Sequence, residues 1–590
     1  MLQAAFDFPR HPLAREDGER VRGAWFEPPA RWLRAFRADE LPALIDAAHA
    51  CARAGAWVLG GLRYEAAPAL DAALTSHSTD KPLVEFAVYE AAPQPWPQGL
   101  SAERLSSDWL DTQADAVEHT QIERIREWIR SGDCYQVNLT TRVKAELMQD
   151  DPAELFLALH QSQPGGFSLF LRDASAGAGV ASVSPELFFD WRPLPEGPHT
   201  WLIAAQPMKG TAPRGDDKVS DEAAQAYLRT SEKERAENLM IVDLLRNDMG
   251  RVAELGSVRV PRLFELLALP TVWQMTSTVT AVGRPNLKLS ELFAALFPCG
   301  SVTGAPKRRA MQIIRELEST PRGWYCGALG LIQPGGVATF NVPIRTVEFD
   351  DQHLSCGIGS AITLDSSPAA EVAEWRAKTR FLLRAQAPIA ALETMRIANG
   401  EYQRIEGHLA RLQRTARHFG LKLSMAAVRE ALARERQGGD WRVRLTVSTA
   451  GGVQIQRQPL PATPARVKLA LAAMPIATHG PDAEFLHHKT TRREMYAPFA
   501  AAKPADAFDV ILWNEASELT ECTFGNVALL IDGRWLTPGA SAGLLPGVMR
   551  ETLLREGRVS EARLTKDDLA RAERLAFFNS LRGWVEAGLE

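Results

Sequence analysis

Two pairs of glutamates, each three residues apart, are prominent candidates for chemistry in this sequence. Glu234 and Glu237 lie in KERAENLMIVDLLRND, and Glu371 and Glu374 lie in AAEVAEWRAKTR. In a helix this spacing puts both carboxylates of a pair on one face. Carboxylates without histidine or cysteine suit a hard cation such as Mg²⁺. Taken alone, Glu234 and Glu237 are equally consistent with a surface turn paired with Lys233 and Arg235, and Glu371 and Glu374 are more typical of a solvated helix face.

Two lysines lie in segments where an amine could act as a nucleophile or a base. Lys209 is bounded by proline and glycine in QPMKGTAPRG, and Lys489 follows two histidines in FLHHKTTRREMY. A lysine among apolar neighbours has a lowered pKa, so its neutral amine can attack an electrophile. A solvated surface charge is the alternative for either lysine when it is considered alone.

Two glycine-containing segments have the form of anion sites at the start of a helix. In LFPCGSVTGAPKRRAMQIIRELE, residues 300–304 predict a loop, Pro306 suits a first helical turn, and residues 310–317 continue a helix. In LLPGVMRETLL a helix begins after Gly547. Pro306 interrupts the GK[ST] arrangement, which excludes a Walker A loop. A tight loop that serves packing alone is the other interpretation of the first segment.

The elements that must position these residues mix helices and strands. QIERIREWIRSGD predicts a helix that ends at Gly132. Leu239 to Val242 and Leu244 to Leu245 are apolar all round, which predicts a buried helix. ETMRIANGEYQRIEGHLARL predicts a strand, an N-G turn, a strand and a helix that open a new unit.

We therefore place a domain boundary at 385–391. It separates a domain over 1–387 from a domain over 388–590. The first domain has an N-terminal subdomain over 1–110, and its chemistry-bearing motifs lie within 118–385.

Composition excludes several classes of function. The net charge is −5 and the pI is about 6.2, so neither nucleic acid nor an acidic membrane surface is indicated as a partner. The six cysteines form no C-x-x-C pair, which favours free thiols in a reducing compartment. We find no signal peptide and no apolar run of about 20 residues. We expect a cytoplasmic protein that acts on small molecules.

The first half resembles the chorismate-utilising family that includes anthranilate, isochorismate and aminodeoxychorismate synthases. The resemblance covers about 118–385 and rests on SGDCYQVNLT, SPELFF, QPMKGTAPRG, KERAENLMIVDLLRND, FPCGSVTGAPKRRAM, RGWYCGALG, FNVPIRT and the final E-x-x-E-x-x-x-K. It implies an α+β fold of layered antiparallel sheets with flanking helices. It also implies that Mg²⁺ is bound directly by Glu237 and Glu374, with Glu234 and Glu371 in support. The residues implied to hold chorismate are Thr303, Tyr325, Arg345 and Lys378.

Within this family, Lys209 is the residue that separates the activities. By resemblance, anthranilate synthases typically carry alanine here, isochorismate synthases use a lysine as a base, and aminodeoxychorismate synthases use it as a covalent nucleophile. The sequence departs from the family at Gln274, where many relatives have histidine, and at Ala361, a usual glycine. Glutamine cannot serve as a general acid, so another group or a water must assist the leaving hydroxyl. No glutaminase motif is present, so we expect ammonia to come from a separate glutamine amidotransferase subunit.

The second half resembles the fold-type IV pyridoxal-phosphate proteins, a group with lyases and aminotransferases. The motifs ETMRI, HLARL, ELTECTFGNV, LTP and LLPGVMR and the lysine carry the resemblance over about 391–590. It implies that Lys489 binds the cofactor covalently and that Glu521 pairs with the pyridine nitrogen, which keeps the ring an electron sink. The implied phosphate ligands are Arg411, the backbone N–H groups of Val548 and Met549, and Ser580. Relatives of this type commonly pair, so a homodimer is expected.

Taken together, the two resemblances imply a bifunctional enzyme of 4-aminobenzoate and folate biosynthesis. The first domain would aminate chorismate to 4-amino-4-deoxychorismate, and the second would eliminate pyruvate from that product. Two alternatives remain open. One is an anthranilate- or isochorismate-type enzyme fused to an aminotransferase. The other is a fusion whose C-terminal domain has no catalytic role.

Overall fold

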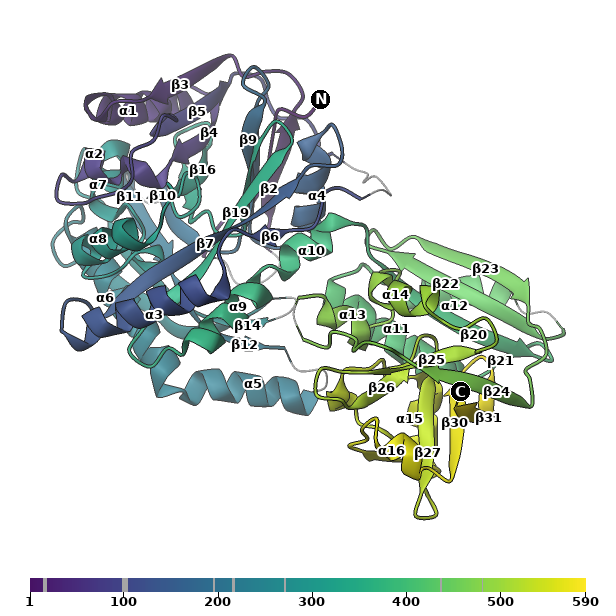
Figure 1. Ribbon diagram of the computed structural model, residues 1–590. Helices are drawn as coiled ribbons and strands as arrows, with labels where there is room; N and C mark the ends of the chain where they lie inside the picture. Colours follow the sequence, from purple (N-terminus) through teal and green to yellow (C-terminus); the bar gives the residue numbers. More distant parts are fainter. Residues whose placement is uncertain are drawn as a thin grey trace. The chain divides into compact units, whose positions relative to one another are not determined.

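The computed structural model describes residues 1–13, 18–97, 104–194, 197–214, 218–269, 272–435, 438–479 and 481–589. The chain divides into two compact units, an N-terminal unit over Met1–Ala387 and a C-terminal unit over Pro388–Glu590 (Figure 1). In the described parts of both units, no helix is both long and apolar enough to cross a membrane.

The N-terminal unit is built on two antiparallel sheets. In the first, neighbouring strands follow the order β15 (Gly304–Ala305), β7 (Gln136–Glu146), β19 (His353–Ile362), β18 (Thr346–Asp350), β9 (Ala178–Ser184), β8 (Phe167–Asp173), β1 (Ala4–Pro9) and β2 (Arg20–Trp25), with β6 (Leu110–Asp111) beside β7. In the second, the order is β12 (Met208–Pro213), β14 (Val272–Val282), β11 (Gly197–Gln206), β10 (Leu187–Leu194), β17 (Ala338–Asn341), β16 (Ala328–Ile332), β4 (Trp57–Leu62), β5 (Val84–Tyr89) and β3 (Arg31–Ala35), with β13 (Arg259–Ala268) beside β14.

Helices flank these sheets. They are α1 (Leu41–Arg53), α2 (Ala67–Leu70), α3 (Asp115–Arg130), α4 (Pro152–Ser162), α5 (Lys218–Thr230), α6 (Glu232–Gly250), α7 (Leu289–Leu296), α8 (Lys307–Leu317), α9 (Pro368–Lys378) and α10 (Arg380–Gln386). The predicted fold of layered antiparallel sheets with flanking helices is confirmed. Helix α3 lies against α9, to which an ion pair between Asp115 and Arg376 ties it at 2.6 Å (Figure 1).

Helix α6 differs from the prediction in how it is buried. Its inner stripe includes Ile241, Val242 and Leu245, which pack into the core of the second sheet. Leu239, by contrast, is 43% exposed. The prediction of a helix buried on all sides is therefore wrong, because the apolar run spans more than the stripe that the sheet covers. Glu234 and Glu237, in the first two turns of α6, face a cavity.

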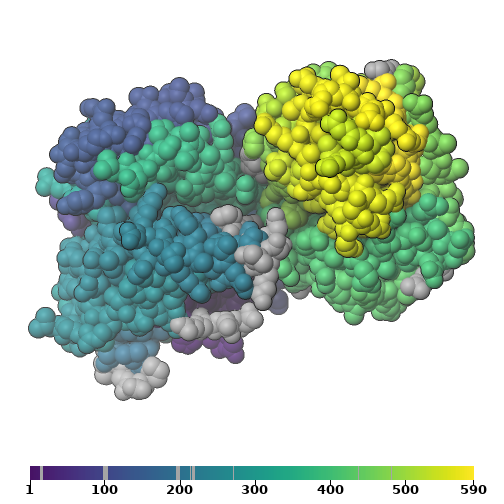
Figure 2. Space-filling model, turned by 90° about the horizontal axis from the view of Figure 1, so that it is seen from below, coloured from purple at the N-terminus to yellow at the C-terminus, as the bar shows by residue number. Residues whose placement is uncertain are grey.

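The C-terminal unit has a smaller and a larger sheet. The smaller has the order β21 (Glu401–Tyr402), β20 (Ala390–Ala398), β22 (Trp441–Ser448) and β23 (Val453–Pro459). The larger has the order β26 (Leu519–Cys522), β25 (Asp509–Trp513), β24 (Arg466–Leu471), β31 (Gly583–Leu589), β30 (Arg574–Asn579), β27 (Asn526–Ile531), β28 (Arg534–Pro538) and β29 (Ser560–Ala562). The last residues of the chain, yellow in Figure 2, form a continuous part of this unit's surface.

The helices of the C-terminal unit lie on and between these sheets. They are α11 (Ile405–Phe419), α12 (Met425–Arg434), α13 (Glu484–His487), α14 (Ala497–Ala501), α15 (Val548–Arg555) and α16 (Asp568–Arg571). The predicted strand, N-G turn, strand and helix at the start of this unit are confirmed as β20, Asn399–Gly400, β21 and α11. Leu409, Leu412 and Ala416 form the buried stripe of α11, and Gly420 ends the helix in the left-handed conformation.

Candidate active sites

A cavity of about 410 Å³ lies between the two sheets of the N-terminal unit. Strands β7 and β19 contribute residues from the first sheet, β12 and β14 contribute from the second, and helices α6 and α9 complete the lining. Eight of the nine residues predicted for this half line it, namely Lys209, Glu234, Glu237, Tyr325, Arg345, Glu371, Glu374 and Lys378. The ninth, Thr303, is fully buried, and its hydroxyl donates to the backbone oxygen of Cys299 at 3.1 Å.

Lys209 extends from β12 into this cavity. Burial lowers the pKa of its amine, and the nearby carboxylates of Glu237 and Glu186 oppose that shift only in part. The next residue, Gly210, has φ +94°, and a Cβ there would lie 3.1 Å from Cβ of Met275. The backbone beside the lysine is therefore one that favours glycine, and it sets the direction in which Lys209 leaves the strand.

Gln274, at the position where the resemblance implies histidine, forms hydrogen bonds to strand β12. Its Nε2 donates to the carbonyl of Gly210 at 2.9 Å, and its Oε1 accepts the hydroxyl of Thr211 at 3.0 Å. Both ends of the amide are thus used to hold the strand that carries Lys209. Trp273 beside it donates its indole N–H to Asp221 at 2.9 Å, and the guanidinium of Arg214 lies 4.7 Å from its ring centroid.

The four predicted metal ligands face the cavity from two helices. Burial raises the pKa of Glu234 and of Glu237, and repulsion from neighbouring carboxylates adds to both shifts. Burial also acts on Glu374, but its ion pair with Lys378 at 2.8 Å lowers the pKa of that carboxyl. Within the described residues, no three His, Cys, Asp or Glu side chains are close enough to form a metal site. The carboxylates share a cavity without being gathered around one point.

Cationic side chains also line this cavity. Arg345 has φ +50° and contacts the side chain of Gln163. Burial and the charge of Arg384 lower the pKa of Arg345 to about 10, so it remains charged near neutrality. Lys378 donates to the carbonyl of Gly359 at 2.8 Å as well as to Glu374. The cavity therefore offers carboxylates for a cation and guanidinium groups for an anion within one enclosed space.

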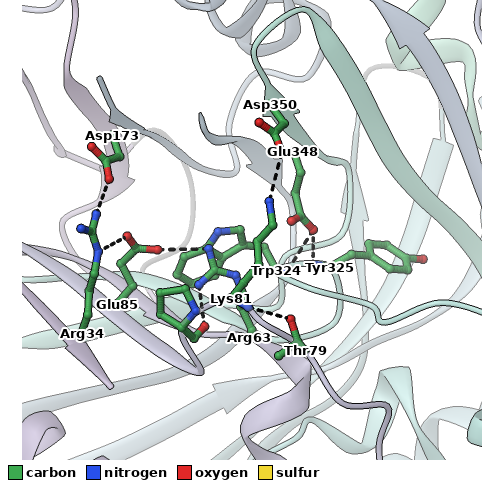
Figure 3. Close-up of polar contacts among 11 residues, drawn as sticks. Arg34, Arg63, Thr79, Lys81, Glu85, Asp173, Trp324, Tyr325, Glu348 and Asp350 are labelled. Atoms are coloured by element: carbon green, nitrogen blue, oxygen red, sulfur yellow. Dashed lines mark hydrogen bonds and ion pairs between the residues drawn. The ribbon is translucent and has the colours of Figure 1, made fainter. Parts of the chain in front are cut away.

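Tyr325 reaches the cavity from a loop that buried carboxylates hold in place. Oε1 of Glu348 accepts the backbone N–H of Trp324 at 2.9 Å and of Tyr325 at 3.4 Å (Figure 3). On the other side, the guanidinium of Arg63 lies 4.3 Å from the Trp324 ring centroid and donates to Glu85 at 3.0 Å (Figure 3). Burial raises the pKa of the Tyr325 hydroxyl, so it stays protonated and can donate a hydrogen bond.

Glu186 is a cavity residue that the sequence interpretation did not single out. It comes directly before β10 in the SPELFF motif and is 3% exposed. Burial raises the pKa of its carboxyl, although a hydrogen bond with Ser301 and the charge of Lys209 oppose the shift. Its Oε1 has no hydrogen-bond partner among the described residues. A glutamate before an apolar run could have been noticed, since a carboxylate entering a buried strand needs a specific reason.

A second cavity, of about 520 Å³, lies between the two sheets of the C-terminal unit. The predicted residues Arg411, Lys489, Glu521, Val548 and Ser580 all line it. The side chain of Met549 packs into an apolar cluster, and only its backbone N–H was predicted to contact the cofactor. Strand β22 adds two arginines that the sequence interpretation missed, Arg442 and Arg444, which share one face of the strand because they are two residues apart.

Lys489 and Glu521 face this second cavity from different elements. Burial lowers the pKa of Lys489 to about 7, and Arg411 and Arg493 add to the shift. Burial raises the pKa of Glu521 to about 7. Oε1 of Glu521 accepts the hydroxyl of Tyr496 at 2.7 Å and the N–H of Leu545 at 3.1 Å. In the described part of the chain no hydrogen bond reaches Oε2, which is left for a ligand.

Arg411 is held by a carboxylate that the sequence interpretation did not assign. Its Nε and Nη2 donate to Glu393 of β20 at 2.9 and 2.8 Å. His408, one turn earlier on α11, contacts Glu393 with Nδ1 at 2.6 Å and Ser580 with Nε2 at 2.7 Å. Despite complete burial, these partners lower the pKa of Glu393 to about 2. The sequence around Glu393, which lies in a strand, does not indicate that it pairs with Arg411.

Comparisons with known proteins agree with this division. A family model described as chorismate binding enzyme matches residues 27–384, and the model for amino-transferase class IV matches residues 390–587. Aminodeoxychorismate synthase component 1 of Klebsiella aerogenes is 41% identical over 306 residues, 52% of this chain and 65% of that protein. Anthranilate synthase component 1 of Streptomyces coelicolor is 37% identical over 295 residues, 50% of this chain and 55% of that protein. The chain thus spans less than two thirds of the length of these curated relatives.

A solved structure supports the fold of the first unit. The crystal structure of anthranilate synthase component I from Streptococcus pneumoniae superposes with a TM-score of 0.50 at 23% identity, covering 64% of this chain and 90% of that one. The predicted combination of a chorismate-binding fold with a class IV aminotransferase-like domain is confirmed. This chain belongs to the chorismate binding enzyme family and carries, after that region, an amino-transferase class IV domain.

Proposed function

We propose that the N-terminal unit aminates chorismate to 4-amino-4-deoxychorismate. The observation that carries this proposal is the placement of Lys209, an amine with a lowered pKa in a cavity that also holds carboxylates and guanidinium groups. A lowered pKa increases the fraction of neutral amine, which can form a covalent bond with substrate, whereas the alanine typical of anthranilate synthases could not. The relatives named aminodeoxychorismate synthase support this assignment.

The carboxylates of this cavity suit Mg²⁺ in their chemistry. Glu237 and Glu374 would hold the ion, with Glu234 and Glu371 beside them, and the bound ion would supply positive charge to neutralise a dianionic substrate. The raised pKa values of Glu234 and Glu237 fit a site that is short of one cation. Lys378 pairs with Oε1 of Glu374, so Oε2 is the oxygen that would bind the ion while this pair is kept.

In the proposed reaction, Lys209 attacks ring carbon 2 of chorismate as the hydroxyl leaves carbon 4. The hydroxyl takes a proton and departs as water. Ammonia then bonds to carbon 4, and the bond between carbon 2 and Lys209 breaks. Arg345 would hold a carboxylate of the substrate, and Tyr325 would donate a hydrogen bond to it. A separate glutamine amidotransferase subunit would supply the ammonia.

Glu186 is the residue we assign as the proton donor to the departing hydroxyl. Burial raises its pKa, which favours the protonated acid, and it faces the same cavity as Lys209. Gln274 cannot take this role, since an amide does not titrate and both of its ends bind β12.

Glu186→Gln is therefore expected to lower kcat for amination by about 100-fold, the scale of general acid catalysis. It should also remove the fall in rate at high pH, because that fall reports the loss of the Glu186 proton. A pH profile of kcat in both proteins checks this. A Glu186→Gln enzyme that keeps the wild-type rate and pH profile would show that another group donates the proton.

We further propose that the C-terminal unit uses pyridoxal phosphate to eliminate pyruvate from 4-amino-4-deoxychorismate, which yields 4-aminobenzoate. The residues of its cavity fit this cofactor. The aldehyde, pyridine nitrogen and phosphate of the cofactor require an amine, a carboxylate and a cation. The cavity offers the Lys489 amine with its lowered pKa, the Glu521 carboxylate with one open oxygen, and Arg411, which donates to the carbonyl of Pro546 just before helix α15. When bound, the cofactor supplies an electron sink for the carbon that carries the substrate amine.

The residues that line this cavity would have separate roles in the reaction. Lys489, neutral above a pKa of about 7, would remove the proton from ring carbon 4 of the substrate. Glu521 would keep the pyridine nitrogen protonated, and Tyr496 and the N–H of Leu545 would fix the carboxylate that does so. Arg442 and Arg444 at the cavity wall suit a substrate with more than one carboxylate. An amine of that class is what the first unit would produce.

Incubation of the purified chain with chorismate, an ammonium salt, Mg²⁺ and pyridoxal phosphate tests the whole proposal. We expect 4-aminobenzoate and pyruvate in equal amounts. EDTA should stop chorismate consumption and leave any visible absorbance of the C-terminal unit unchanged, because only the first cavity would use the metal. Anthranilate or salicylate as the aromatic product would contradict the proposal, and accumulation of 4-amino-4-deoxychorismate would contradict its second half.

A further inference from the structure

A line of buried hydrogen bonds joins Arg411 and Ser580, two residues that line the C-terminal cavity. It runs from Arg411 to Glu393, from Glu393 to His408 and from His408 to Ser580. The histidine is fully buried, and Ser580 is 9% exposed. Three of the four residues, His408, Arg411 and Ser580, line the cavity, so the line ends at the wall on both sides.

The directions of these hydrogen bonds can be worked out from charge. Glu393 is ionised, with a pKa lowered to about 2, so it can only accept hydrogen bonds. Nδ1 of His408 must therefore carry a proton and donate to it. In a neutral imidazole, Nε2 then has no proton and accepts the hydroxyl proton of Ser580. In this state the only proton of Ser580 is directed at the histidine and not at the cavity.

We propose that His408 is a positioning residue that takes up a proton when the phosphate group of the cofactor binds. With both ring nitrogens protonated, Nε2 donates to Ser580 Oγ, and the serine hydroxyl is released to donate to a phosphate oxygen. The same histidine keeps its bond to Glu393, which continues to hold Arg411 by two of its nitrogens. This inference rests on the proposed cofactor site in this unit.

The charges that face His408 fit such a response. Burial lowers the pKa of His408 first of all, and Arg411 on its own helix and Lys489 from the facing loop lower it further, whereas Glu393 on β20 raises it. The ring is therefore neutral while the cavity holds no anion. A phosphate group with nearly two negative charges, placed between Arg411 and Ser580, offsets the two cations and favours the protonated ring.

The test compares pyridoxal 5′-phosphate with pyridoxal, which lacks the phosphate and can react with Lys489 in the same way. We expect His408→Asn and Ser580→Ala each to weaken binding of pyridoxal 5′-phosphate by about ten-fold, the scale of one charge-assisted hydrogen bond. Binding of pyridoxal should change less than about two-fold. The double variant should bind pyridoxal 5′-phosphate no more weakly than His408→Asn alone, because both changes break the same line of hydrogen bonds.

Calorimetry at pH 8 in buffers of different ionisation enthalpy then measures how many protons the protein takes up when each ligand binds. Wild-type protein should take up more protons with pyridoxal 5′-phosphate than with pyridoxal, and His408→Asn should abolish this difference. Thr537→Val is the matched control, since it removes another buried hydroxyl, bonded to the carbonyl of Val527 at 2.8 Å, outside the cavity lining. It should leave both affinities and the proton count unchanged.

The possible results distinguish the role of His408 from the proposed cofactor site on which it depends. An equal loss of affinity for both ligands in His408→Asn and Ser580→Ala, or an unchanged proton difference in His408→Asn, would overturn the role of His408. Failure of the wild-type protein to bind either ligand would overturn the proposed cofactor site and with it this inference. Selective loss of the phosphorylated ligand, with loss of the proton difference, supports it.

Discussion

Lys209→Ala is expected to reduce formation of 4-amino-4-deoxychorismate by at least about 1,000-fold, the scale of removing a covalent catalytic group. The alanine leaves the carboxylates and guanidinium groups of the cavity in place, so chorismate should still bind. The reason for the loss is that burial lowers the pKa of Lys209, whereas the other lysines of the described lining, Lys233 and Lys378, are exposed. Chorismate consumption and product identity, followed by chromatography with an ammonium salt as nitrogen source, measure the effect.

Two further variants make the Lys209 result specific. Lys209→Arg keeps a positive charge but gives no usable nucleophile, so it should be as inactive as Lys209→Ala if the lysine forms a bond. Lys144→Ala removes an exposed lysine of β7 and should leave the rate unchanged. An arginine variant with near wild-type amination would mean that only the charge at this position matters, and the covalent step would have to be abandoned.

Lys489→Ala is the second change with a large expected effect. It should remove the absorbance near the visible edge that a lysine-linked pyridoxal phosphate gives, and release of 4-aminobenzoate should fall by at least about 1,000-fold. 4-Amino-4-deoxychorismate should then accumulate, because the first cavity is untouched. Lys422→Ala, which removes an exposed lysine of the same unit, is the control and should retain both the absorbance and the product.

The pKa of Lys489 adds a dependence on pH. Since burial lowers this pKa to about 7, the reactive neutral amine predominates above pH 7 and becomes scarce below it. The rate of cofactor attachment to the apoprotein should therefore fall by about ten-fold per pH unit below 7. Stopped-flow absorbance between pH 5.5 and 8.5 checks this. A rate that still rises steeply above pH 9 would indicate an amine with the ordinary pKa of lysine.

The sequence predicts the folds of both units because long motifs and local signals agree there. The N-G turn at Asn399–Gly400 and the helix α11 follow directly from local patterns. The cavity of the first unit, by contrast, does not follow from local sequence patterns. Glu237 and Glu374 come from helices far apart in the chain, and only their shared motif context suggested that they meet.

The remaining features depend on contacts that no local pattern records. Glu186 was overlooked because a single glutamate beside an apolar strand has no periodic signal. Glu393 pairs with His408 and Arg411 across a strand-to-helix contact, and its role is visible only once β20 and α11 are packed. Thr303 was assigned by motif, whereas the structure turns its hydroxyl to its own loop.

The left-handed backbone at Gly210 has a consequence for how this fold could change its chemistry. The left-handed backbone of Gly210 and the hydrogen bond from Gln274 to its carbonyl fix the main chain directly beside side chain 209. A different residue could therefore be exchanged at that point without rebuilding the walls around it. Different reactive side chains could therefore be accepted at position 209, while Gly210 would tolerate almost no replacement.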